Sequence, residues 1–204
     1  MSVISRLTEH FGRFPGIGPR QAKRFVYFLL TRDHRTLDDI ARLIQELKRE
    51  VHHCEMCFRY FTGRERALCD VCSDAHRTAD TLMVVEKDVD FENIERSGVY
   101  DGKYFILGGS VPVLEKEPEK RVRSRELLTR MNKELSSGNF KELILALSAT
   151  PEGDSTERYL KECLAPLQAD YPFKISHLGR GLSTGTELEY SDSDTIRNAL
   201  ENRS

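Results

Sequence analysis

The sequence predicts a multi-module α/β protein: N-terminal helices joined by a hairpin, a four-cysteine zinc finger, an α/β domain with a mainly parallel four-stranded sheet, and a C-terminal tail helix. Three observations predict it: a glycine-rich turn between helical segments, four cysteines in two close pairs, and short apolar runs that alternate with helical patterns after Thr81. Apolar strands separated by helices are typical of a parallel sheet covered on both faces. We therefore expect four parts, at residues 1–52, 53–77, 78–176 and 177–204.

The N-terminal part has the apolar periodicity of helices. Ile4, Leu7 and Phe11 recur every three or four residues, which predicts a short amphipathic helix. After a sharp break, a second helix is expected over about residues 20–30. Apolar residues on one face predict a third helix over residues 37–51.

The break between the first two helices reads Pro15-Gly16-Ile17-Gly18-Pro19. Glycine tolerates positive dihedral angles at both Gly16 and Gly18, and Ile17 can be buried to fix the turn. Such a turn directs backbone amides outward at the start of a helix, where they can hold a phosphate oxygen. This pattern favours a helix-hairpin-helix that binds DNA without regard to sequence. An ordinary helix–helix corner is the alternative, and a dinucleotide-binding glycine loop is disfavoured because no strand precedes it.

Basic residues follow the turn directly. Arg20 and Arg24 share one face of the second helix, with Lys23 beside them. The formal net charge of the chain is only −2, so DNA binding requires a local patch of this kind or a ring assembly. We expect Gly16, Gly18, Arg20, Lys23 and Arg24 to contact DNA; a solvated basic face is the alternative.

The four-cysteine pattern predicts a metal site. Cys54 and Cys57 form one pair and Cys69 and Cys72 another, with two residues inside each pair and eleven between them. Thiolate pairs on tight turns match the tetrahedral coordination of a structural zinc ion. Two disulfides are the alternative, disfavoured because the rest of the chain holds only Cys163, which we expect to be a buried, inert thiol.

Histidines beside the quartet offer a second choice of ligand. His52, His53 and His76 lie close to it in sequence, but four well-spaced cysteines leave no vacancy. The segment has few apolar residues, so metal binding is expected to supply its folding energy. Arg59, Arg64 and Arg66 can offset the charge of four thiolates, contact phosphates, or form a solvated face.

The α/β part is read as alternating strands and helices. Strands are expected at residues 82–85, 104–107, 143–147 and 173–176, and helices at residues 91–96, 125–135, 155–167 and 193–202.

Three acidic residues are expected at one edge of this sheet. Glu86 closes the first strand, and Glu152 and Asp154 follow the third. The carboxyl ends of parallel strands meet at one edge, where ligands usually bind. Hard carboxylate oxygens suit Mg²⁺, which can support phosphoryl transfer. Partner binding, a structural role and a solvated edge are the alternatives.

In this order and size, the modules resemble the bacterial RecR family of recombination mediators over essentially the whole chain. The most specific stretches are Phe14–Arg24, the cysteine quartet, Val84-Val85-Glu86, Glu152–Thr156, and the tail Arg180-Gly181-Leu182 with Gly185–Tyr190. The chain departs from the family pattern at residues 110–116, 148–151 and 182–185, which puts partner contacts or ring geometry in doubt more than DNA binding.

The resemblance implies a Toprim-type α/β domain and a ring-like homo-dimer or homo-tetramer that encircles or clamps DNA, with the C-terminal segment in subunit contacts. It implies work with RecO, and in many bacteria RecF, to load RecA on gapped DNA. It also implies that Arg20 and Arg24 contact DNA. The family is not regarded as catalytic, so the three acids would hold a metal weakly or engage RecO.

The sequence thus favours a non-enzymatic DNA-repair scaffold with a structural zinc ion. The alternative is a Mg²⁺-dependent Toprim nuclease or phosphotransferase using Glu86, Glu152 and Asp154; a third reading is a pure protein-interaction module. No run of eighteen apolar residues and no apolar leader is present, so we expect a cytoplasmic protein without a membrane span.

Overall fold

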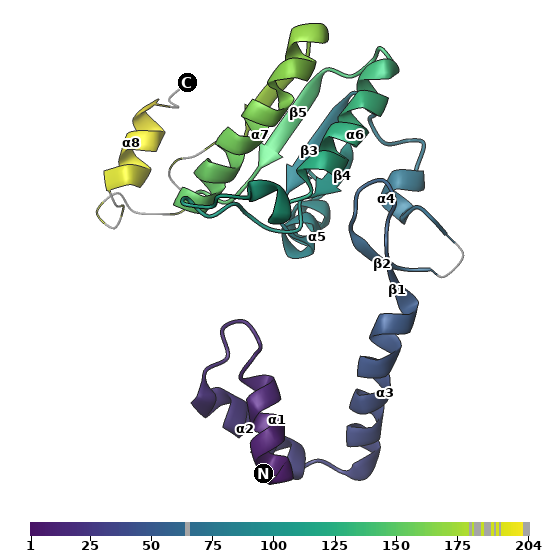
Figure 1. The fold of residues 1–204 in the computed structure, drawn as a ribbon, viewed down its shortest axis with the longest axis vertical. Helices are drawn as coiled ribbons and strands as arrows, with labels where there is room; N and C mark the ends of the chain where they lie inside the picture. Colours follow the sequence, from purple (N-terminus) through teal and green to yellow (C-terminus); the bar gives the residue numbers. More distant parts are fainter. Residues whose placement is uncertain are drawn as a thin grey trace. The chain divides into compact units, whose positions relative to one another are not determined.

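The computed structural model describes residues 1–63, 66–179, 181, 185, 189, 191 and 193–201. The chain divides into two compact units, Met1–Val51 and His52–Ser204 (Figure 1). The first contains helices α1 Val3–Phe11, α2 Pro19–Leu30 and α3 His34–Glu50. The second contains a small sheet of β1 Val51–His53 and β2 Tyr60–Thr62, and a larger α/β part; β1 starts on the last residue of the first unit. The α/β part contains α4 Asp70–Ser73, β3 Thr81–Val85, α5 Asp88–Ser97, β4 Lys103–Ile106, a 3₁₀ turn at Pro118–Lys120, α6 Ser124–Ser136, β5 Glu142–Ala146, α7 Pro151–Asp170, β6 Lys174–His177 and α8 Ser193–Glu201.

In the first unit, α1 and α2 pack against each other through a few apolar side chains. The ring of Phe11 meets that of Phe25 edge to face, with centroids 6.0 Å apart. Ala22 and Val26 are the buried residues of α2. The small size of this contact leaves most apolar side chains of the unit accessible, and no residue of α3 is buried.

The start of α3 differs from the sequence-based expectation. The helix begins at His34, three residues before the predicted start, because Asp33 caps it. The Asp33 carboxylate accepts a hydrogen bond from the Thr36 amide at 2.9 Å, which satisfies one of the first-turn donors.

The larger sheet is parallel throughout, with strand order β4-β3-β5-β6. The expectation of a mainly parallel four-stranded sheet is confirmed. At the centre of the sheet, Val84 on β3 lies between Phe105 on β4 and Leu145 on β5. Its place in the middle of the sheet explains why β3 is apolar along nearly its whole length.

Alternate residues of β3 point to two separate cores, as expected for a strand covered on both faces. Leu82 and Val84 belong to a core closed by α6 and α7 (Figure 1). Met83 and Val85 belong to a second core, which α5 and the four-cysteine segment close. The sheet therefore has helices on one face and a helix together with the cysteine module on the other.

Helix α7 also starts earlier than expected, at Pro151 rather than Ser155. The hydroxyl of Thr150 accepts from the Gly153 amide at 3.1 Å, and proline suits the first helical position. The consequence is that Glu152 and Asp154 lie in the first turn of a helix and not in a loop.

Candidate nucleic-acid interface and metal centre

The turn between α1 and α2 places its two glycines in different conformations. Gly16 has a φ of 73°, in the left-handed region, whereas Gly18 has an extended backbone with φ −79° and ψ 168°. Only Gly16 uses the positive dihedral angle that was expected to be tolerated at both. The Ile17 amide donates to the Phe14 carbonyl at 3.1 Å, and the Ile17 side chain is half-buried rather than buried.

The N-terminus of α2 has no side-chain cap. Gly18 occupies the N-cap position, and the first intrahelical bond runs from the Ala22 amide to the Gly18 carbonyl at 3.0 Å. Pro19 has no amide hydrogen, so Arg20 and Gln21 carry the first-turn amides without an intrahelical acceptor. Such amides, at the positive end of the helix dipole, favour an anion.

There is open space around this helix end. The residues expected to contact DNA are all exposed: Gly16, Gly18, Arg20, Lys23 and Arg24. A methyl group added at Gly18 would meet no atom within 4 Å. The φ of Gly18 is one that any residue adopts, so the fold itself does not require glycine there. A group approaching from outside would have access to the backbone.

Helix α2 has a positive exposed surface. Its sequence, PRQAKRFVYFLL, contains three basic residues and no acid. The Arg24 guanidinium makes only a long contact, 3.5 Å, with the Gln21 side-chain oxygen, and the Lys23 ammonium lies 5.9 Å from the centre of the Tyr27 ring. These cations are therefore accessible to phosphates.

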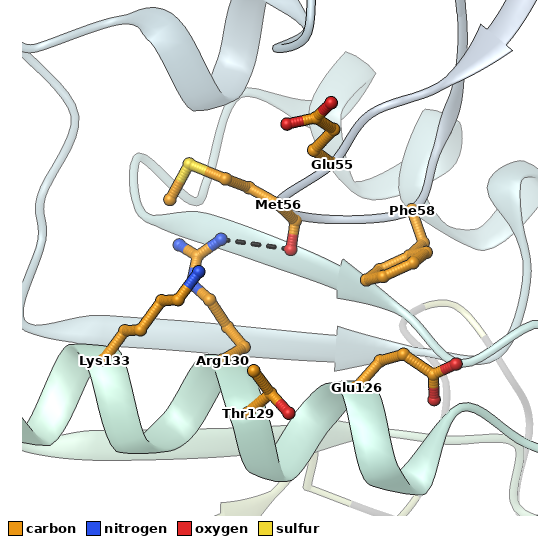
Figure 2. A pocket seen from close by; sticks show the side chains of 7 residues that line it. All are labelled: Glu55, Met56, Phe58, Glu126, Thr129, Arg130 and Lys133. Atoms are coloured by element: carbon orange, nitrogen blue, oxygen red, sulfur yellow. Dashed lines mark hydrogen bonds between the residues drawn. The ribbon is translucent and has the colours of Figure 1, made fainter.

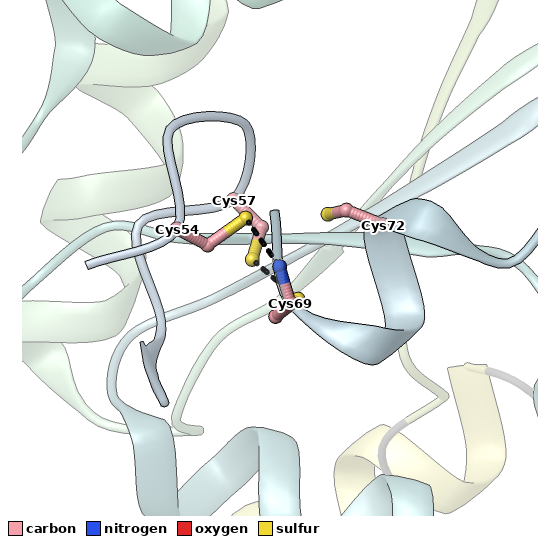
Figure 3. Close-up of side chains that lie close together, drawn as sticks. All are labelled: Cys54, Cys57, Cys69 and Cys72. Carbon is pink, nitrogen blue, oxygen red and sulfur yellow. Dashed lines mark hydrogen bonds between the residues drawn. The ribbon is translucent and has the colours of Figure 1, made fainter. Parts of the chain in front are cut away.

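The four cysteines come together as the spacing predicts (Figure 3). Cys54 and Cys57 lie on the turn between β1 and β2; Cys69 caps α4 and Cys72 lies within it. The four sulfur atoms lie within 4.8 Å of one another, and all four residues are buried. The Cys57 and Cys69 sulfurs are 3.6 Å apart. A zinc ion with four bonds of about 2.3 Å requires a sulfur–sulfur distance of about 3.8 Å, so the donor set fits this ion.

The alternatives to four thiolate ligands find no support among the described residues. All five cysteines are free, so the quartet does not form disulfides. No histidine joins the group, and His52, His53 and His76 are exposed.

Hydrogen bonds from the neighbouring thiols, Cys57 first, lower the pKa of Cys54, whereas the same contacts, Cys54 first, raise the pKa of Cys57. The Cys69 amide also donates to the Cys54 sulfur at 3.4 Å, a bond that favours a thiolate. Cys163 is half-buried, whereas a buried thiol was expected.

The cysteine module shares an apolar core with the sheet, although its few apolar residues led us to expect that metal binding supplies its folding energy. Phe61 and Val71 are buried together with residues of β3, β4 and α5. Polar contacts join the same surfaces. The Lys103 ammonium donates to the carbonyl of Val71 at 3.0 Å, and the buried Arg130 guanidinium donates to that of Met56 at 3.1 Å. Apolar contact and hydrogen bonds therefore add to whatever the metal contributes.

A cavity of about 250 Å³ lies where the first cysteine turn meets α6 (Figure 2). Met56 and Phe58 give it apolar walls, and Arg130 spans it to reach the Met56 carbonyl. Phe58 has a φ of 63°, rare for a residue with a side chain, and its ring packs edge to face on Phe105 at 5.5 Å. The sequence pattern gave no sign of this conformation.

The acidic residues at the sheet edge are not gathered into one cluster. Among the described residues, only the cysteine quartet meets the geometry of a shared metal site. Glu152 and Asp154 are exposed, whereas Glu86 is only 4% exposed. The Glu86 carboxylate accepts a hydrogen bond from the Ser148 amide at 2.8 Å, so it anchors the loop that follows β5.

Two further residues of this edge were not anticipated from the sequence. A side chain at Gly153 would lie 1.9 Å from the Ser148 carbonyl oxygen, so only glycine allows the loop to approach α7. Thr156, fully buried, accepts a bond from the Val111 amide at 2.8 Å and donates to the Glu152 carbonyl at 2.7 Å. Both residues lie in the stretch Glu152–Thr156 that carries the family resemblance, and this stretch was the available signal.

Three known families match this chain in the order of its modules. Residues 4–48 match the RecR helix-hairpin-helix family, residues 80–179 the Toprim domain family, and residues 181–204 the RecR C-terminal family. No helix of the described residues is long and apolar enough to cross a bilayer. The tail stretch singled out at residues 180–190 lies mostly outside the described residues.

Curated relatives match over nearly the entire chain. Recombination protein RecR of Lactobacillus helveticus is 32% identical over 200 residues, 98% of this chain and 96% of the relative. The RecR protein of Bdellovibrio bacteriovorus is 34% identical over 205 residues, 100% and 97% of the two chains. That of Bifidobacterium animalis subsp. lactis is 36% identical over 201 residues, 98% and 95%. With the same modules in the same order and this identity over the full length, the chain belongs to the RecR family of recombination proteins.

Proposed function

We propose that this protein is a non-enzymatic DNA clamp or scaffold of recombinational repair. In this proposal it works with RecO, and with RecF where present, to load RecA on gapped DNA in the cytoplasm. The observation that supports it best is the uncapped, exposed N-terminus of α2. There the amides of Arg20 and Gln21 and a helix with three cations and no acid can hold phosphate oxygens.

A protein that binds DNA through its phosphates does not distinguish one base from another. Gly16, Gly18, Arg20, Lys23 and Arg24 would position the backbone of DNA, and affinity would be similar for unrelated sequences. The zinc ion would be structural, because the four cysteines are buried and offer no open coordination position.

A clamp requires more than one copy of the chain, and the first unit offers apolar surface for self-association. Helix α3 exposes Leu43, Ile44 and Leu47, each more than half accessible. A contiguous apolar face of this kind on a soluble domain indicates an interaction surface. A homo-dimer or homo-tetramer would cover it. The C-terminal segment would add a further subunit contact.

The acids at the sheet edge have no catalytic part in this proposal. Glu86 already holds the Ser148 amide, while Glu152 and Asp154 are accessible to a protein partner such as RecO or to a weakly bound Mg²⁺. The nuclease alternative rests on the types of these three residues alone.

The test is DNA binding by fluorescence anisotropy with two unrelated duplexes and a gapped duplex. The proposal predicts equal affinity for both duplexes and a strong loss in the double variant Arg20→Ala/Arg24→Ala. The matched control is Arg96→Ala/Arg125→Ala, which removes two exposed arginines from α5 and α6. Unchanged binding by the α2 variant, or an equal loss in the control, would contradict it.

A further inference from the structure

The β1–β2 sheet carries an exposed aromatic pair beside the metal site. The rings of His53 and Tyr60 lie with centroids 4.1 Å apart and an angle of 34° between their planes. Both side chains are exposed, Tyr60 by 53%. Each ring uses one face for the contact within the pair, so the pair still offers aromatic surface to a flat ligand.

The fold does not use this face of the sheet for packing. Along β2 the burial pattern alternates: Phe61 is buried in the core, whereas Tyr60 and Thr62 on either side are exposed. Side chains of a strand point to opposite faces in turn, so Phe61 packs in the core while Tyr60 points to solvent. An aromatic residue is not needed at position 60 to close the core.

The pair is held in a fixed position. The Tyr60 amide donates to the Asp88 carboxylate at the start of α5 at 2.8 Å. The Cys54 amide donates to the Arg59 carbonyl at 2.9 Å, which sets His53 opposite Tyr60. Cys54 belongs to the cysteine quartet, so this hydrogen bond ties the aromatic pair, here called the platform, to the candidate metal site.

Two guanidinium groups lie along the same strand. Arg59 packs 4.4 Å from the centre of the Phe91 ring and donates through Nε to the Tyr60 carbonyl at 3.4 Å. Arg66 donates to the Thr62 carbonyl at 3.5 Å and pairs with Asp70. The Arg66 guanidinium also lies over the Phe61 ring, so both cations follow the edge of β2 on its core side and not the face of Tyr60. Exposed aromatic rings can stack the bases of single-stranded nucleic acid, and Arg59 is at that edge, hydrogen-bonded to the Tyr60 carbonyl.

We propose that this aromatic face, His53 and Tyr60, is a second DNA contact that stacks an unpaired base of single-stranded DNA, with Arg59 at the neighbouring strand edge. The inference rests on the proposed DNA-binding function and extends it to a separate surface. Bases inside a duplex present no free ring face, so the platform would discriminate unpaired DNA from duplex, which the hairpin at α2 would bind through phosphates alone. The plainer interpretation is that the pair only stabilises the small sheet as a cross-strand contact.

The experiment compares the full-length protein with Tyr60→Leu and His53→Leu/Tyr60→Leu, using oligothymidylate and a blunt duplex as probes. Leucine keeps an apolar side chain on the strand but removes the aromatic face. The variants are expected to bind oligothymidylate about tenfold more weakly, with unchanged duplex affinity, zinc content and melting temperature. Tyr60→Phe should restore oligothymidylate binding, and Tyr171→Leu, which removes an exposed tyrosine at the end of α7, should have no effect.

The outcomes separate this inference from the proposed function. Unchanged oligothymidylate affinity in a folded, zinc-loaded Tyr60→Leu protein would overturn the stacking platform while leaving duplex binding intact. An equal loss for both probes would overturn it too, since it would indicate a structural role. If the wild-type protein bound neither probe, both proposals would fail. Cross-linking of a bromodeoxyuridine oligonucleotide to residues 53–60 would give independent support, and its absence at saturating protein would count against the platform.

Discussion

The amide of Ile106, at the end of β4, donates a hydrogen bond of 2.8 Å to the carbonyl of Cys57 in the cysteine quartet. Ile106 is fully buried in the core that the sheet shares with the cysteine module. The sheet and the candidate metal site are therefore parts of one cooperative structure. A change at the metal should be measurable in the stability of the sheet.

Removal of the metal is thus expected to destabilise the whole second unit. The variant Cys54→Ser/Cys57→Ser should contain no zinc, whereas the wild-type protein should contain one zinc ion per chain by elemental analysis. Its thermal unfolding, followed by circular dichroism, should begin at a clearly lower temperature, because structural zinc supplies folding free energy. Cys163→Ser is the control and should retain zinc. A zinc-free double variant with unchanged melting would show that the metal has no structural role.

Gly18 and Gly16 should respond differently to alanine. At Gly16 the positive φ makes alanine unfavourable, by about 1–2 kcal/mol of unfolding free energy. Gly18→Ala meets open space and an extended backbone, so it should cost less stability than Gly16→Ala; alanine is nevertheless a poorer N-cap residue than glycine, and a loss of about 0.5–1 kcal/mol is expected. The new methyl group at Gly18 should also weaken DNA binding, because it covers the backbone that phosphate is expected to approach. Denaturant unfolding and anisotropy titration measure the two effects.

The control for Gly18→Ala is Gly179→Ala, another exposed glycine with no neighbouring atom within 4 Å. Weaker DNA binding in both variants would point to a general effect of added side chains. Full DNA affinity in Gly18→Ala would remove the backbone of this turn from the interface.

Glu86 is expected to act as a loop anchor and not as a catalytic group. Glu86→Gln keeps an oxygen that can accept from the Ser148 amide, so it should fold normally. Glu86→Leu leaves that amide without its acceptor and should lower the unfolding free energy by about 1–3 kcal/mol. Incubation of wild-type protein with Mg²⁺ and labelled gapped DNA should give no turnover. Turnover that disappears in Glu86→Gln would instead favour the nuclease alternative.

The protein should lose stability in alkaline solution through two tyrosines, Tyr104, which is buried, and Tyr100, which is partly buried. Burial raises the pKa of Tyr100 to about 12 and also raises that of Tyr104 above its ordinary value. In the unfolded chain these tyrosines have the ordinary pKa of 10, so they lose their protons at a lower pH than in the folded protein. The stability they contribute is therefore fully present below pH 10 and is lost as the pH rises through the folded pKa. Denaturant midpoints should therefore fall as the pH rises from 10 toward 12. Tyr100→Phe should reduce this fall, and equal pH dependence in the variant and the wild type would contradict the assignment.

The sequence predicted the parts that depend on local patterns. Apolar runs identified the four strands and their parallel arrangement, and the two-residue spacers identified the cysteine quartet. The starts of α3 and α7 were placed three and four residues late, because capping by Asp33 and Thr150 overrides the apolar periodicity that was used to locate them.

Contacts between segments that are far apart in the chain could not be predicted from the sequence. That Phe61 and Val71 would join the core of the sheet depends on tertiary packing, as does the burial of Glu86 against the Ser148 loop. The three acids looked alike in the sequence. Only their surroundings separate a buried anchor, Glu86, from the two exposed residues of the α7 first turn.

The most direct test of the account is the salt dependence of duplex binding by the wild-type protein and by Arg20→Ala/Arg24→Ala. Each phosphate contact contributes a slope of about −0.9 to a plot of log affinity against log salt concentration. Loss of both arginines should weaken binding to every sequence and flatten the slope by about two, while Arg96→Ala/Arg125→Ala keeps the wild-type slope. Equal slopes and affinities for the α2 variant and the wild-type protein would contradict phosphate binding at the hairpin.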